Sequence, residues 1–153
     1  QTDDIRIPQA LEIAEERGIV VSFGQAILRE AHPNTAQLIL HGRSGQRLEI
    51  IGQSLGGSRI NIAQLDGIET NFSGESPTLV VYNEDRPGHV SEVTTMLSNQ
   101  NINIASMRLY RSSRGGEAVM VVECDQEVPE SGIDWLRGFD GIRKVTYLGM
   151  TGE

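Results

Sequence analysis

The residues best suited to chemistry in this 153-residue chain lie between Thr78 and Ile104. A short apolar run, Leu79–Tyr82, predicts a buried strand, and the polar turn Asn83–Arg86 with Pro87 and Gly88 follows it. Proline suits the first position of a helix, and the continuing apolar spacing predicts a helix that begins at Pro87, with an apolar stripe made by Val90, Val93 and Leu97. The unbonded N–H groups and positive dipole end of such a helix suit a small anion such as a carboxylate.

The elements that must position this turn follow along the C-terminal half. The pattern predicts a long strand Ile102–Tyr110, in which Asn103, Ala105, Met107 and Leu109 face one side and Ile104, Ser106, Arg108 and Tyr110 the other. A hairpin turn, a central apolar strand, a short helix and a last strand follow at 112–116, Ala118–Cys124, Gly132–Arg137 and Ile142–Leu148. The order βαββαβ predicts a ferredoxin-like sheet with both helices on one face. Its other face is expected to be uncovered and to need a partner.

The N-terminal half reads as part of a larger α/β domain. A helix is predicted over Pro8–Arg17, ended by Gly18. About five mostly antiparallel strands are predicted to follow, at Ile19–Phe23, Ala36–His41, Gln46–Gln53, Arg59–Gln64 and Ile68–Phe72, with turns at 43–45 and at Asp66-Gly67. The Gly-rich segment 54–58 lacks the lysine and following helix of a phosphate-binding loop, which favours a turn.

Composition narrows the class of protein. A net charge of −8 without a basic stripe argues against a nucleic-acid partner. No apolar run approaches the ~20 residues of a membrane helix, and no signal peptide is visible. One cysteine, Cys124, excludes an internal disulfide and is consistent with a cytoplasmic location. Because the chain begins with Gln, it is consistent with a fragment or a processed product.

The segment NEDRPGHV, followed about twenty residues later by INIASM, resembles the ACT domain, a small regulatory module that binds amino acids. The resemblance covers Thr78 to about Met150. It implies that the Arg-Pro-Gly turn cradles the ligand and that the Asn of the next strand contacts the ligand across a homodimer interface. The ligand-binding set that it implies is Asn83, Asp85, Arg86, Pro87, Gly88, His89, Val90, Asn103 and Ile104.

Each of these residues also has a purely structural interpretation. Gly88 either lets its backbone approach a carboxylate or only relieves strain in the turn. Asp85 pairs with the ammonium of an amino acid, caps the helix at Pro87, or does both. Asn103 bonds the ligand's amino or hydroxyl group, or is simply a polar residue at a strand start. Asn83 stands where related serine-binding domains often have His, although an amide can also hold a serine hydroxyl. Arg86 is expected to face solvent or to pair with Glu84.

The order of pieces extends the resemblance to nearly the whole chain. An Arg-Ile-Pro helix, a His-Pro-Asn-Thr segment and Ser-Leu-Gly-Gly-Ser before the Asp-Gly hairpin resemble the β subunit of bacterial iron-sulfur L-serine dehydratase. This implies a partial dehydratase β-type domain at 1–75, an ACT domain at 76–153, and a catalytic α subunit that carries the iron-sulfur cluster. The family's usual first half domain, with its Ser-Ser-Ser-His-Thr segment, is absent from this sequence. A single cysteine cannot hold such a cluster within one chain.

Three functions are therefore open. The first is a non-catalytic regulatory subunit of a serine dehydratase that senses L-serine or another small amino acid. The second is a dimerisation or docking module without a ligand, and the third is the regulatory tail of a phosphoglycerate dehydrogenase, a more distant resemblance. No acid–base or nucleophile constellation indicates a stand-alone enzyme. Cys124 is expected to be a buried, inert thiol, and His32, His41 and His89 lack the spacing of metal ligands.

Overall fold

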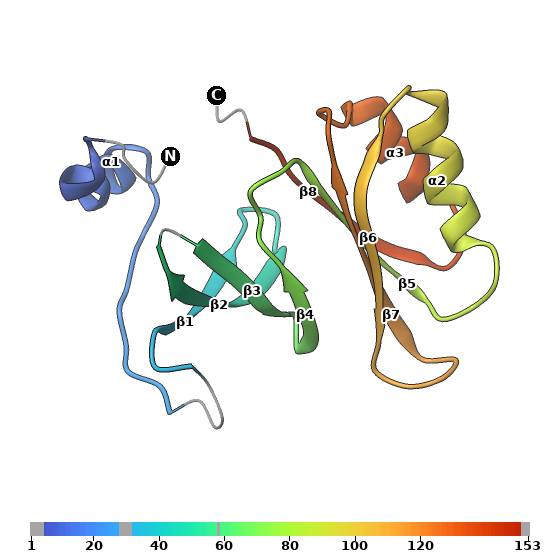
Figure 1. The fold of residues 1–153 in the computed structure, drawn as a ribbon. Coiled ribbons are helices and arrows are strands. Elements are labelled where there is room, and N and C mark those ends of the chain that lie inside the picture. The colour runs from blue at the N-terminus through green and yellow to red at the C-terminus, as the bar shows by residue number, and fades with distance from the viewer. Residues whose placement is uncertain (1–4, 28–31, 58, 151–153) are drawn as a thin grey trace. The chain divides into compact units, whose positions relative to one another are not determined.

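The computed structural model describes residues 5–27, 32–57 and 59–150, which fall into two compact units, Gln1–Pro33 and Asn34–Glu153. The first unit contains a 3₁₀ turn, η1 (Ile7–Gln9), that runs directly into helix α1 (Ala10–Glu16) (Figure 1). Gly18 follows with φ +70°, the left-handed conformation that commonly ends a helix at glycine. The predicted N-terminal helix is thus confirmed.

The strand predicted at Ile19–Phe23 is wrong. These residues form no strand, and Val20 and Phe23 are almost fully exposed. β-Branched content only indicates that a segment fits a pleated, half-buried surface. A strand also needs a hydrogen-bonding neighbour, and none pairs with this segment among the described residues.

The second unit begins with an antiparallel sheet. Its strands are β1 (Thr35–His41), β2 (Arg47–Gly56), β3 (Arg59–Leu65) and β4 (Ile68–Phe72), in the order β1-β2-β3-β4. The Asp66-Gly67 hairpin has φ values of +46° and +83°, as the turn that follows the right-handed twist of paired strands requires. Four strands form here instead of about five, and Ser58, part of the predicted Gly-rich turn, lies outside the described residues.

The ferredoxin-like order βαββαβ is confirmed in the rest of this unit. It consists of β5 (Thr78–Glu84), α2 (His89–Asn99), β6 (Ile104–Arg111), β7 (Glu117–Cys124), α3 (Glu130–Arg137) and β8 (Ile142–Leu148). The strand order is β6-β7-β5-β8, with every pair antiparallel and with β7, the predicted central strand, in the interior. The predicted division of the chain at residue 75 falls between β4 and β5 and stays a prediction.

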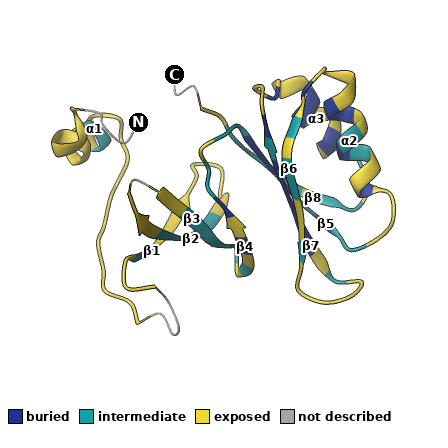
Figure 2. Cartoon of the chain, in the orientation of Figure 1, coloured by how far each residue is buried: buried dark blue, intermediate teal, exposed yellow. Residues whose placement is uncertain are grey.

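Helices α2 and α3 cover one face of this sheet, and most buried residues of the chain lie there (Figures 1 and 2). The core beneath them includes Leu79, Val81, Val93, Leu97, Met120, Val122, Ile133 and Leu136. The predicted stripe is partly wrong, because Val90 is 44% exposed and the buried face of α2 includes Met96 and His89 instead.

The alternation predicted for β6 fails at its start. Ile104 pairs with Cys124 and Ser106 with Glu123, so Ala105 is an extra residue in the ladder. Such a bulge shifts the phase of a strand by one residue. Ile104 therefore packs against the helix-side core together with Met107, although the simple alternation placed them on opposite faces.

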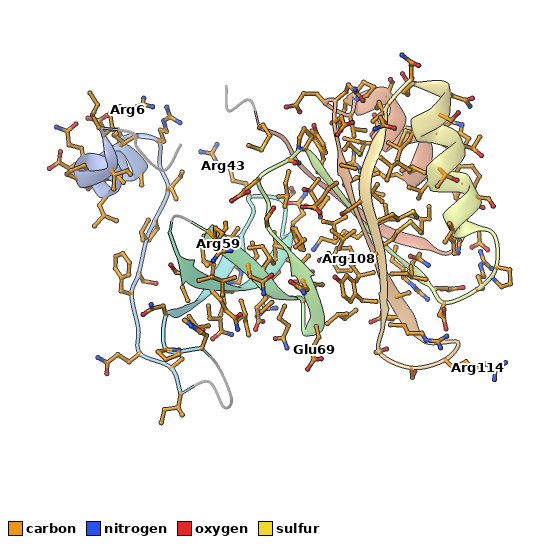
Figure 3. All side chains as sticks on the ribbon, viewed as in Figure 1. Arg6, Arg43, Arg59, Glu69, Arg108 and Arg114 are labelled. Atoms are coloured by element: carbon orange, nitrogen blue, oxygen red, sulfur yellow. The ribbon has the colours of Figure 1, made fainter. Side chains whose placement is uncertain are left out.

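The expectation that the second face of this sheet is uncovered is also wrong. Val80, Val119 and Val121 on that face are buried in one cluster with Leu65 and Phe72 of the β1–β4 sheet. At the margin, the Tyr110 hydroxyl accepts from the Asn71 N–H at 2.9 Å, and the Arg108 guanidinium donates to the Asn71 carbonyl (Figure 3). The chain thus covers this face with its own first sheet, which an ordering of elements along the sequence could not indicate.

Candidate functional site

The loop between β5 and α2 forms an open helix mouth. Gly88 is the N-cap with φ +113°, and α2 begins at His89, so Pro87 lies before the helix and not at its first position. The Gly88 carbonyl accepts the first intrahelical bond, from the Glu92 N–H at 3.0 Å. The N–H groups of residues 89–91 consequently have no acceptor within the helix. A positive φ favours glycine, so position 88 has a structural reason to be glycine as well as the proposed functional one.

Asp85 does not cap α2, because no side chain caps this helix. Its Oδ2 accepts from the Gly115 N–H at 2.9 Å and from Arg111 at 3.2 Å, which fastens the loop to the β6–β7 hairpin. The Gly115 hydrogen bond, followed by the hydrogen bond from Arg111, holds the pKa of Asp85 below its usual value despite opposing desolvation. The carboxylate that was predicted to meet an ammonium group is therefore already bonded within the chain.

The Arg86 side chain is also bonded to other residues of the chain. Its Nη2 donates to both the carbonyl and the carboxylate of Asp140, the latter at 2.9 Å, while Nη1 stands 3.7 Å from Glu84. The expected pairing with Glu84 is thus present but is the longer contact. The hydrogen bond from Arg86 lowers the pKa of Asp140. Arg86 therefore ties the β5–α2 loop to the turn that precedes β8.

His89 is the buried centre of the same network, with only 2% of its surface exposed. Arg86 Nε donates to His89 Nε2 at 3.1 Å, and His89 Nδ1 lies 2.7 Å from Glu92 Oε2. Because Nε2 accepts, Nδ1 carries the proton that Glu92 accepts. His89 thus links Arg86 of the loop to Glu92 of α2 through its two ring nitrogens, and Val90 next to it points outward.

Gly141, in the turn that precedes β8, also belongs to this site. It has φ +89°, and a Cβ at this position would stand 2.5 Å from Arg86 Nη2 and 2.8 Å from His89 Nε2. Both values are shorter than real contacts of a Cβ atom. The signal available in the sequence was the Asp140-Gly141 dipeptide, a common turn pair, but nothing in that pair indicates that Arg86 packs against it.

Asn83, at the end of β5, is 4% exposed. Its Nδ2 donates to the Glu84 carbonyl at 2.7 Å, and its Oδ1 is buried with no hydrogen-bond partner among the described residues. An unsatisfied buried acceptor is costly, and such an atom calls for a functional or structural explanation. Asn83 is the one predicted ligand-binding residue with a buried acceptor left free.

Asn103 and Ile104 lie at the other end of α2. Asn103 Nδ2 donates to Asp125 at 2.6 Å, and its N–H to Gln126 at 2.7 Å. Both residues line a groove of about 340 Å³ together with Thr94, Leu97, Ser98, Asn101 and Ile102. The eleven residues of α2 lie between Gly88 and Asn103, which places Asn103 roughly 16 Å from Gly88 along the helix axis. One copy of the chain therefore does not bring Gly88 and Asn103 together.

Other candidate chemistry is limited. Cys124 is fully buried, and burial, with the charge of Asp125, raises the pKa of its thiol to about 11. Within the described ranges, no three His, Cys, Asp or Glu side chains gather as they would around a metal ion. The described helices are all too short or too polar to cross a bilayer.

Comparison of the sequence with known proteins identifies its family. Residues 78–137 match the ACT domain. The chain is 35% identical over 147 residues, 96% of its length, to the probable L-serine dehydratase β chain of Bacillus subtilis, and 28% identical over 149 residues to the L-serine dehydratase β chain of Peptoniphilus asaccharolyticus. The chain belongs to the L-serine dehydratase β-chain family. Its ACT domain is the part that contains the helix mouth.

Two further results concern how much of each relative the chain covers and which other proteins it resembles. The chain spans about two thirds of the curated β chains that it matches, 66% and 67% of their lengths. It is also 31% identical over 95% of its length to the D-3-phosphoglycerate dehydrogenase of Methanocaldococcus jannaschii, where it covers 27% of that protein. This similarity, too, extends over nearly the whole chain.

Proposed function

We propose that this chain is a regulatory element of an iron-sulfur L-serine dehydratase, and that its ACT domain binds L-serine or another small amino acid. The catalytic α subunit carries the cluster and converts serine to pyruvate and ammonia, while this chain contributes no catalytic group. The assembly works in the cytoplasm. The sequence similarity to the two dehydratase β chains supports a serine dehydratase as the enzyme to which this chain belongs. The match to the ACT domain supports an amino acid as its ligand.

The two ends of α2 suit the two ends of a zwitterion. The free N–H groups of residues 89–91 form a positive helix end, which favours a carboxylate. Ser98 and Asn103 line the groove beside the last turn of α2, where the helix dipole is negative and favours an ammonium or hydroxyl donor. Because Asn103 lies roughly 16 Å from Gly88 within one chain, a second copy must bring its Asn103 to the Gly88 mouth of the first. The proposed sensor is therefore a homodimer.

The observation that carries the proposal is the free acceptor of Asn83. Its Nδ2 is committed to the Glu84 carbonyl, which fixes the amide orientation and leaves Oδ1 as the acceptor. A ligand hydroxyl or ammonium is the donor that would satisfy it. A site that hydrogen-bonds a ligand donor discriminates strongly against analogues that lack it.

Isothermal titration calorimetry with L-serine tests this proposal, with glycine and D-serine as comparison ligands. We expect heat of binding with the wild-type chain and at least a tenfold loss of affinity in Asn83→Ala, because one ligand hydrogen bond is lost. Asn71→Ala is the matched control, since the described contacts of Asn71 use only its backbone. Absence of heat with any small amino acid up to millimolar concentration would contradict the proposal.

Two alternatives have specific support. The similarity to a phosphoglycerate dehydrogenase favours the regulatory tail of such an enzyme, which would use the same site in another host. The internal bonding of Asp85 and Arg86 favours a docking module without a ligand. A ligand-free docking module would give no heat of binding in the calorimetry. The two possible enzymes are distinguished by the protein to which this chain belongs. A dehydratase α chain co-purifies with it in the first case, and a dehydrogenase domain is fused to it in the second.

A further inference from the structure

The contact between the two sheets of the second unit has a polar centre. Lys144 of β8 donates from Nζ to Asp66 Oδ2 at 2.9 Å and to the Arg47 carbonyl at 3.1 Å, both in the β1–β4 sheet. The same Nζ lies 4.9 Å from the ring centre of Tyr82 on β5. One partly buried cation therefore contacts both sheets. Lys144 is also the only lysine in the sequence.

Asp66 is held rigidly on its own sheet. Its Oδ1 accepts from the Glu49 N–H at 2.8 Å, and its own N–H donates to the Glu49 carbonyl at 2.8 Å. Desolvation alone would raise the pKa of Asp66, but the hydrogen bonds from Lys144 and from Glu49 outweigh it and lower that pKa. The carboxylate is therefore a charged anchor for Lys144 at neutral pH.

Tyr82 and Asn83 connect the Lys144–Asp66 contact to the β5–α2 loop. They are consecutive residues at the end of β5, so their side chains lie on opposite faces of the sheet. Tyr82 packs toward the β1–β4 sheet, while Asn83 lies on the helix side. Asn83 Oδ1 is a buried side-chain acceptor without a hydrogen-bond partner among the described residues. The Tyr82 hydroxyl is buried beside Asp66, and burial, followed by the charge of Asp66, raises the pKa of Tyr82. The unsatisfied acceptor, which calls for an explanation, thus adjoins a residue that interacts with Asp66.

The pairing of β5 with β8 is irregular at the same point. Tyr82 pairs with Lys144 and Asn83 with Ile142, which leaves Arg143 as an extra residue in β8. The end of β5 is therefore not held by a regular ladder on this side. A small shift of Asn83 would move Tyr82 relative to Lys144 and Asp66.

We propose that Tyr82, Lys144 and Asp66 form a latch that couples the β5–α2 loop to the β1–β4 sheet. Closed, the latch holds the ACT sheet against the first sheet through Lys144. A ligand that satisfies Asn83 moves the end of β5 and changes the strength of the Lys144 contacts, so the first sheet senses the occupancy of the loop. This second step rests on the proposed function, whereas the latch itself does not.

The single lysine allows a direct measurement. Lys144 also lines a groove of about 730 Å³, and its side chain is 34% exposed, so an amine-reactive ester can reach Nζ when the latch opens. Peptide mass spectrometry of the native full chain gives the acylation rate at Lys144 separately from that of the N-terminal amine. Asp66→Asn removes the anchoring charge but keeps a residue suited to the left-handed turn, and Trp135 fluorescence verifies its fold.

We expect Asp66→Asn to acylate at Lys144 about fivefold faster, as for loss of a partly exposed ion pair. Asp134→Asn, which removes a carboxylate from an exposed ion pair on α3, should leave the rate unchanged. Equal rates in the wild-type chain and Asp66→Asn would overturn the latch.

L-Serine should change the rate in the wild-type chain and have little effect in Asp66→Asn. If calorimetry shows binding but the wild-type rate does not respond, the coupling is refuted. If L-serine does not bind at all, the proposed ligand fails, and the Asp66→Asn rate still decides the latch.

Discussion

Replacement of Gly141 by alanine tests whether the Arg86–His89 network positions the β5–α2 loop. The new Cβ would stand 2.5 Å from Arg86 Nη2 and 2.8 Å from His89 Nε2, so the guanidinium must leave both Asp140 and His89. The left-handed φ costs about 1–2 kcal/mol for a non-glycine residue, and loss of the buried hydrogen bond to His89 costs about another 1 kcal/mol. We expect the free energy of unfolding to fall by roughly 2–3 kcal/mol in total.

Gly45→Ala is the matched control, because Gly45 has φ +83° and no atom within 4 Å of the added Cβ. It should show the conformational cost alone, about 1–2 kcal/mol, in chemical denaturation followed by circular dichroism. Gly141→Ala should cost less in an Arg86→Ala background than in the wild-type background, because the guanidinium is gone and only His89 Nε2, 2.8 Å from the added Cβ, must still shift. Equal costs for Gly141→Ala and Gly45→Ala in the wild-type background would refute the reasoning.

Three more outcomes follow from the described contacts. Leu97→Ala should lower the free energy of unfolding by about 2–5 kcal/mol, while Val90→Ala on the exposed face of α2 should change it by less than about 0.5 kcal/mol; similar values in denaturant titrations would contradict the assigned helix face. Cys124, buried with its pKa raised to about 11, should not react with a thiol reagent at about pH 8 until denaturant unfolds the domain, and rapid native labelling would count against its burial. The folded pKa of Asp66 lies below its unfolded value, so its stabilising contribution is complete above about pH 5 and is lost as pH falls through the folded pKa; Asp66→Asn should therefore lose less stability than the wild-type chain between about pH 5 and pH 2, and parallel pH profiles would contradict this.

The order of the elements in the ACT domain followed from the sequence because local patterns were strong there. Val-rich β7 and the apolar spacing of α2 each indicate their element without distant contacts. The Ile19–Phe23 segment shows the opposite case. Its β-branched residues satisfy the same local rule, but a strand forms only where another strand can pair with it.

The helix mouth was predictable from the sequence, but the contacts around it were not. The Arg-Pro-Gly turn marks the helix mouth in the sequence, and Gly88 indeed has a positive φ. The partners of that turn come from residues 25 to 55 positions away, as Gly115 does for Asp85 and Asp140 for Arg86. Nothing in a turn's own sequence indicates such partners, and the cover on the second face of the sheet was unforeseen for the same reason.

The central claim is that one copy supplies the Gly88 mouth and a second copy supplies Asn103 to the same ligand. Gly88→Ala strains a left-handed φ of +113° at the mouth, with no atom closer than 3.9 Å to the added Cβ, whereas Asn103→Ala removes an exposed amide at the other end of α2. Neither variant alone should bind L-serine in calorimetry.

A mixed dimer of the two variants contains one site with an intact Gly88 from one copy and an intact Asn103 from the other. Co-expressed with different affinity tags and purified as the mixed species, this dimer should recover binding at one L-serine per dimer, half the stoichiometry of the wild type. A mixed dimer that binds no L-serine, as expected for each single variant, would contradict the shared site. Binding of L-serine by a monomeric wild-type chain would contradict it as well.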